Sequence, residues 1–193
     1  MRLGIDPKVD YAFKRLFGDP SHSQVLLHLL NAIFENQFQI ADVQILSPFL
    51  EKDFDDDKLS ILDLRVCDTI GRQYNLEMQT RIPLGLPGRL AYYVSSMYSG
   101  QLVEGDPYSR LCPAISICLL NKWLLPDTAS FHTRFRLSSL EEGIELTDDL
   151  EIHLIEFPKV ELVPTAVRES TTLEKWVYFF ASSPESVGKI RFG

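Results

Sequence analysis

The 193-residue chain has 45% hydrophobic and 11% aromatic residues, enough to build one domain with a substantial core, or one domain with an appendage. Its formal net charge of −8 argues against a protein that coats nucleic acid through bulk electrostatics, although a nuclease needs only a local basic rim around its cleft. We recognise no signal peptide and no run of about 18 apolar residues, and three cysteines without a CxxC motif are typical of a reduced, cytoplasmic protein.

Two amphipathic helices are predicted at the start of the chain. Asp6 and Pro7 form a helix-start signal, and apolar residues then recur at helical spacing. Ser21 predicts the N-cap of a second, longer helix that ends near residue 35, and a short strand at residues 43–46 follows. The expected apolar stripe of the first helix consists of Val9, Phe13, Leu16 and Phe17.

Residues 60–68 and 72–79 are the most informative part of the sequence, because both alternate with the period of half-buried strands. The three residues between them suit a hairpin loop in which Gly71 takes the left-handed conformation. Asp68 then faces Arg72, and the rest of the register follows. The predicted pairs are apolar on one face (Leu62–Met78, Leu64–Leu76 and Val66–Tyr74) and polar on the other, where Asp63 opposes Glu77 beside Arg65, Asn75 and Gln79.

The predicted pairing of Asp63 with Glu77 needs a physical explanation. Two carboxylates directly opposite on a sheet have Cβ atoms roughly 5 Å apart and repel each other. A shared proton, a nearby arginine or lysine, or a divalent cation with hard oxygen ligands would offset the repulsion. A carboxylate pair that holds Mg²⁺ is also a means of activating water against a phosphodiester. The competing interpretation is a solvated sheet face that simply tolerates both charges.

The elements after the hairpin predict an α/β fold. Pro83 and Pro87 introduce a helix at residues 88–102, and residues 113–120 are nearly all apolar, as in a central strand buried on both faces. A helix between a hairpin and a buried strand is a crossover connection, which implies a mixed central sheet flanked by helices.

The last part of the chain predicts a β-rich extension, with alternating strands at residues 131–137 and 151–157 and a helix near residues 173–181. We therefore divide the chain into a core, residues 1–125, and a C-terminal extension, residues 126–193, packed on that core. The four histidines share no metal-ligand spacing and are assigned no role: His22, His28, His132 and His153.

The order αβββαβ and several short segments resemble the PD-(D/E)XK nuclease superfamily. The similarity is greatest to its branch of recombination-promoting nucleases and transposase-like proteins, in a Glu-x-Gln variant. The matching segments are Asp10-Tyr-Ala-Phe-Lys14, Ser60-Ile-Leu-Asp63, Asn75-Leu-Glu77-Met-Gln79, Arg89 with Tyr92 and Tyr93, and Pro113-Ala-Ile-Ser-Ile117. The resemblance implies a restriction-endonuclease-like core for residues 1–125.

The resemblance further implies a metal-dependent DNA endonuclease that hydrolyses phosphodiester bonds with Mg²⁺, or with Mn²⁺ as a substitute. Asp63 and Glu77 would bind the metal. Gln79 stands where the superfamily usually has a lysine, and an amide can hydrogen-bond a water but carries no charge. Lys14 is our candidate for the missing charge and Asp10 for an outer metal ligand. Arg89 would either contact a substrate phosphate or neutralise Glu77.

Two other functions remain open at this point. Gln79, the acidic net charge and a C-terminal helical region shorter than the resemblance leads us to expect would fit a catalytically silent module that binds DNA or partner subunits. A third interpretation is an α/β protein with an unrelated small-molecule pocket. DNA is the expected partner and a homodimer is a candidate assembly; we expect a cytoplasmic protein with no membrane association.

Overall fold

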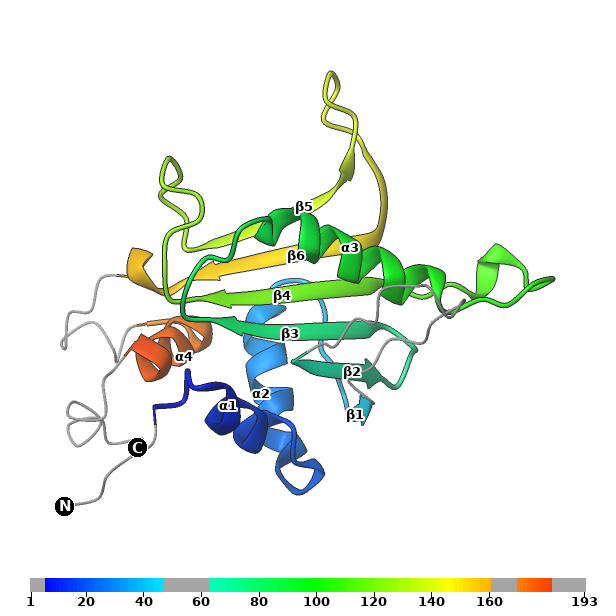
Figure 1. Ribbon diagram of the computed structural model, residues 1–193. Coiled ribbons are helices and arrows are strands. Elements are labelled where there is room, and N and C mark those ends of the chain that lie inside the picture. The colour runs from blue at the N-terminus through cyan, green and yellow to red at the C-terminus, as the bar shows by residue number, and fades with distance from the viewer. Residues whose placement is uncertain (1–5, 47–62, 161–169, 182–193) are drawn as a thin grey trace, which may run out of the picture.

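A computed structural model describes residues 6–46, 63–160 and 170–181 (Figure 1). A mixed sheet forms its centre, and helices cover both faces. The helices are α1 (Asp10–Phe17), α2 (Ser23–Ile33), α3 (Leu86–Ser99) and α4 (Thr172–Ala181). The strands are β1 (Val43–Leu46), β2 (Leu64–Asp68), β3 (Gln73–Gln79), β4 (Ala114–Leu120), β5 (His132–Ser138) and β6 (Glu145–Glu156). Short 3-10 turns lie at Pro20–His22, Tyr108–Arg110 and Phe157–Lys159.

The six strands lie in the order β1-β2-β3-β4-β6-β5. The pairs β1–β2, β2–β3 and β5–β6 are antiparallel, whereas β3–β4 and β4–β6 are parallel. Helix α3 makes the crossover between the parallel strands β3 and β4, as the sequence predicts. Strand β4 is buried along its whole length, which is typical of a central strand covered on both faces.

The register of the β2–β3 hairpin is the predicted one. Leu64 pairs with Leu76 and Val66 with Tyr74, and Gly71 takes a positive φ of 92° in the loop. These four apolar side chains are buried, so the alternation of apolar residues along the two strands and the length of the loop specify the same register. The predicted pair between residue 62 and Met78 lies outside the described residues.

The two faces of the sheet are packed differently (Figure 1). The face that carries Tyr74 and Leu76 packs against α1, α2 and α4 in one large core cluster. Helix α3 covers the opposite face, where Leu86 and Leu90 pack around Cys118 of β4. Residues of β3 that alternate with the core residues therefore face α3.

The first helix starts later than predicted. Residues 7–9 form a turn and α1 begins at Asp10, so Val9, expected in the apolar stripe, is half exposed. Two contacts hold these residues in the turn. The Asp6 carboxylate accepts a hydrogen bond from the Lys8 backbone N–H at 3.0 Å. The buried Lys8 ammonium then donates to the Phe180 carbonyl at 2.5 Å, which ties this turn to the end of α4.

Strands β5 and β6 continue the central sheet. Strand β6 pairs with β4 from Leu150 to Glu156, and β5 lies beyond it as an edge strand among the described residues. Both predicted strands of the extension are present, and β6 begins six residues earlier than expected, at Glu145. The division of the chain at residue 125 stays a prediction.

Candidate active site

Asp63 and Glu77 lie on the sheet face that α3 covers. Asp63 directly precedes β2 and accepts a hydrogen bond from the Met78 backbone N–H at 3.3 Å, which holds it beside β3. Glu77 is only 3% exposed. Burial, together with the nearby Asp63 charge, raises the pKa of Glu77 to about 7 despite an opposing cation. Burial likewise raises the pKa of Asp63, against the lowering effect of the Met78 hydrogen bond and the Lys14 charge.

That opposing cation is Arg89 of α3. Its Nη2 atom lies 2.9 Å from Oε1 of Glu77, and its guanidinium carbon lies 5.8 Å from the ring centroid of Tyr93. The other carboxylate oxygen, Oε2 of Glu77, is buried and has no hydrogen-bond partner among the described residues. A buried oxygen without a partner is costly, so this carboxylate has one coordination position left open.

Helix α1 brings a lysine to the same site from the other side of β2. The Lys14 ammonium lies 2.9 Å from Oδ1 of Asp10 and 3.9 Å from Oδ1 of Asp63. The hydrogen bond to Asp10 is the main reason that the pKa of Lys14 is raised. Asp10 thus reaches Asp63 through Lys14, and its carboxylate is largely exposed.

Gln79 ends β3 and lies two residues beyond Glu77, so both side chains point to the same face of the sheet. Its backbone carbonyl accepts a hydrogen bond from Asn121 N–H at 2.9 Å, at the end of β4. The side chain is partly exposed, as a group that contacts solvent or substrate would be.

The donors at this site fit a hard divalent cation. Mg²⁺ is commonly held by one or two carboxylates and keeps several of its waters, so Asp63 and Glu77 suffice as protein ligands. The open Oε2 position of Glu77 supports this fit. No group of three or more histidine, cysteine or acidic side chains that could hold a metal ion occurs in the described part of the chain, at this site or at any other.

Sequence reasoning missed a buried polar cluster between β5 and β6. Nε2 of His132 lies 2.7 Å from Nδ1 of His153, and Nε2 of His153 lies 2.8 Å from Oε1 of Glu151. Strand pairing brings these residues together, and no spacing in the sequence signals it. His153 packs against the Phe34 ring at the end of α2, whereas Glu77 faces α3. The histidine cluster is therefore not part of the candidate site.

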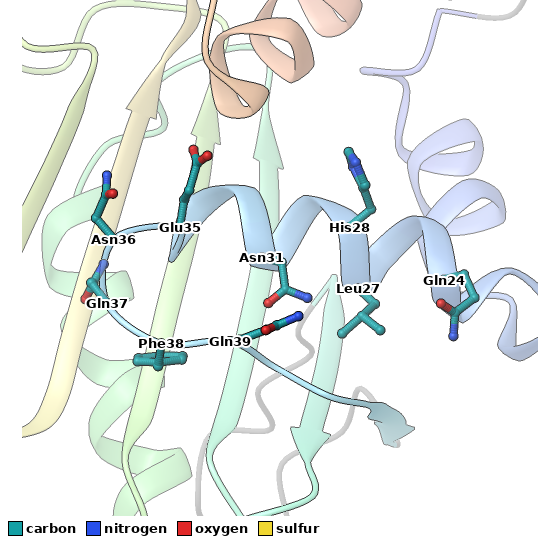
Figure 2. Close-up of a pocket in the computed structure, with 9 residues that line it drawn as sticks. All are labelled: Gln24, Leu27, His28, Asn31, Glu35, Asn36, Gln37, Phe38 and Gln39. Atoms are coloured by element: carbon teal, nitrogen blue, oxygen red, sulfur yellow. The ribbon is translucent and has the colours of Figure 1, made fainter.

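An open depression of about 940 Å³ lies along α2. Figure 2 shows that its lining side chains come from α2 and the segment that follows it. Amide side chains predominate and none of the lining residues is an arginine or lysine, so it has no cation to bind phosphate. The Asn31 amide is already hydrogen-bonded to the backbone of Ile40. Its titratable lining side chains are one carboxylate, Glu35, and one imidazole, His28, so it lacks the pair of neighbouring carboxylates that the Asp63–Glu77 site has.

Comparison with known proteins identifies the class. A family model described as PD-(D/E)XK nuclease family transposase matches residues 7–189. The chain therefore belongs to this nuclease family, with a six-stranded mixed sheet consistent with a restriction-endonuclease-like fold. Membership indicates a function of nuclease or transposase type and implies DNA as the substrate. No curated protein and no solved structure matches the chain significantly. Among the described residues, no helix is long and apolar enough to cross a membrane.

Proposed function

We propose that this chain is a metal-dependent DNA endonuclease that hydrolyses phosphodiester bonds in transposition or recombination, with Asp63 and Glu77 as its metal ligands. One observation carries the proposal: the buried Glu77 carboxylate has one oxygen paired with Arg89 and the other without a partner, beside a second carboxylate. A purely structural ion pair would not need the second carboxylate or the open oxygen.

Mg²⁺, with Mn²⁺ as a substitute, is the proposed cation. When bound, such a cation lowers the pKa of a water and stabilises the charge that develops on the phosphate. The water oxygen forms a bond to phosphorus as the bond from phosphorus to the leaving sugar oxygen breaks. Gln79 orients the water through its side-chain amide, since it lies on the same face as Glu77.

Lys14 supplies the positive charge that Gln79 cannot. Its ammonium is 3.9 Å from Asp63, close enough to offset negative charge at the site. Asp10 holds the ammonium in place and serves as an outer acidic ligand. Arg89 neutralises Glu77 and, because it is one-third exposed, also reaches toward a substrate phosphate.

The second candidate function is a catalytically silent module that binds DNA or partner subunits. The Arg89–Glu77 contact would then be a structural ion pair, and Gln79 would only cap the polar face. The absence of a lysine at residue 79 and the net charge of −8 favour this alternative.

Metal binding distinguishes the two candidates. Mg²⁺ or Mn²⁺ should raise the melting temperature of the wild type, since a ligand that binds only the folded state stabilises it. Asp63→Ala should lose that gain in melting temperature. End-labelled DNA should be cleaved by the wild type in the presence of the metal and not by Asp63→Ala. A wild-type protein with no metal-dependent shift and no cleavage would contradict the endonuclease and favour the silent module.

A further inference from the structure

An exposed tryptophan and two basic residues lie at the end of the sheet that carries the candidate site. Arg81 follows β3 and Lys122 follows β4, and both are exposed. Trp123, the next residue, is 58% exposed. A large aromatic ring left in water costs free energy that burial elsewhere would have recovered, so its exposure needs a reason.

The loop that carries Trp123 is anchored at considerable cost. Glu156, which is fully buried, accepts backbone hydrogen bonds from Leu124 and Leu125 at 2.6 and 3.0 Å. The Lys159 ammonium lies 2.5 Å from the same carboxylate and donates to the Leu125 carbonyl at 2.8 Å. Burying an ion pair has a large desolvation cost, which these hydrogen bonds to the loop backbone offset. Because the contacts are lost if the loop moves, they hold it in one conformation. Trp123 is therefore exposed directly before two residues, Leu124 and Leu125, whose backbone is held in place.

The anchored loop also lies close to the candidate site. Asn121 N–H donates to the Gln79 carbonyl, and Leu124 and Leu125 pack in the cluster around the start of α3, the helix that carries Arg89. Trp123 is five residues beyond Cys118, the strand partner of Glu77. Five residues span at most about 18 Å, which corresponds to about five nucleotides at 3.4 Å each.

We propose that Trp123 stacks on an unpaired base of DNA bound at the candidate site, while Lys122 and Arg81 contact the flanking phosphates. The inference rests on the proposed function and narrows its substrate to DNA with a single-stranded or unstacked nucleotide near the scissile phosphate. A base pair in an intact duplex hides the π-face that a tryptophan needs, whereas a single strand presents it. The two adjacent cations favour a polyanion over an apolar protein surface as the occupant.

Tryptophan fluorescence gives a direct test, because the chain has two tryptophans. Trp176 packs on the core cluster and donates to His28 at 3.0 Å, so Trp176→Phe leaves Trp123 as the reporter. This variant is titrated with a single-stranded 12-nucleotide DNA and with the matching duplex, in EDTA so that no cleavage intervenes. We expect quenching by the single strand, and weaker quenching by the duplex.

Affinity is measured in parallel with labelled DNA. Trp123→Ala should weaken single-strand binding roughly 5- to 150-fold, the range for loss of one stacked base. Trp123→Phe should retain most of the affinity, and Lys122→Ala should reduce the salt dependence of binding. The matched control is Leu84→Ala, because Leu84 is fully exposed near the same edge and has no ring to stack.

Two results would overturn the inference. The first is a wild type that fails to bind single-stranded DNA, and the second is a Trp123→Ala variant that binds it as the wild type does. In the second case, altered self-association of Trp123→Ala in sedimentation would make Trp123 a protein contact. Binding in EDTA does not require cleavage. A failure of this inference can therefore be distinguished from a failure of the proposed endonuclease function, which is measured with the metal present.

Discussion

The guanidinium of Arg89 on α3 lies 2.9 Å from the buried carboxylate of Glu77 on β3. This contact joins the crossover helix to the sheet at the candidate site, and it compensates a charge whose burial is otherwise unfavourable. Arg89 thus occupies one oxygen of the carboxylate that we propose as a metal ligand. A metal bound at Glu77 would therefore act on the same charge as Arg89.

Removing Arg89 should destabilise the metal-free protein and increase its response to metal. Arg89→Ala leaves Glu77 buried without its cation, at a cost of about 1–3 kcal/mol once the partial exposure of Arg89 is allowed for. Mg²⁺ should then restore more stability in Arg89→Ala than it adds to the wild type. Urea unfolding with and without Mg²⁺ measures both quantities, with Arg89→Lys as the charge-preserving control. An equal Mg²⁺ effect in wild type and Arg89→Ala would contradict this account.

Replacing Lys14 should affect cleavage far more than stability. Lys14 and Asp10 are both substantially exposed, so their ion pair contributes less than about 1 kcal/mol to folding. Lys14→Gln removes the cation beside Asp63 and should lower the cleavage rate by about 10-fold or more. The matched control is Arg15→Gln, which removes an exposed cation one residue further along α1. If both variants cleave at the same rate, Lys14 has no part in the reaction.

Acid should weaken the β5–β6 region through its histidine pair. Burial and the neighbouring His153 and Arg134 lower the pKa of His132 to about 4, although Glu151 acts in the opposite direction. A lowered folded pKa means that the unfolded chain binds the proton more readily between pH 6.5 and 4, so stability falls as pH falls through that window. His132→Gln should reduce the loss of stability between pH 7 and 5 by about 1 kcal/mol, after a discount for partial exposure. Urea unfolding at both pH values measures it.

The control for this prediction is His22→Gln, since His22 is exposed and lies outside β5 and β6. The same pH dependence in His132→Gln and wild type would show that the His132–His153 contact does not titrate in this range.

The anchor of the loop after β4 should be sensitive to loss of its lysine. Lys159→Met leaves Glu156 buried with only two backbone donors, and should cost about 2–4 kcal/mol of folding free energy. Limited proteolysis should then cut the loop around residues 121–130 faster. Lys175→Met, at an exposed position of α4, should change neither quantity. An unaltered digestion pattern in Lys159→Met would argue against the anchor.

The hairpin register could be predicted because its information is local. Gly71 closes a short loop, and the alternation on both sides allows only one pairing that buries Leu64 and Leu76 together. The placement of Glu77 on the face opposite the main core follows from the same register. The sequence also offered two partners for Arg89, and the structure shows the contact with Glu77.

The remaining features depend on contacts between distant segments. The turn before α1 is held by the Lys8 contact with Phe180, which no helix-start signal near Asp6 reveals. The contact between the His132 and His153 side chains depends on the β5–β6 register. That register shifts near Leu137, so simple alternation in the sequence does not reveal it. Long-range contacts of this kind have no signature at fixed sequence spacing.

Cleavage of supercoiled plasmid is the most direct test of Asp63 and Glu77 as the metal-binding pair of a nuclease. Wild type, Asp63→Ala and Glu77→Ala are compared with Mg²⁺, Mn²⁺ or EDTA, together with an unfolding curve for each variant to confirm folding. We expect the wild type to nick the plasmid only when the metal is present, and we expect both variants to lose this activity. Nicking that survives both substitutions, or a folded wild type that never cleaves, would contradict the assignment of Asp63 and Glu77 as the metal-binding pair of a nuclease.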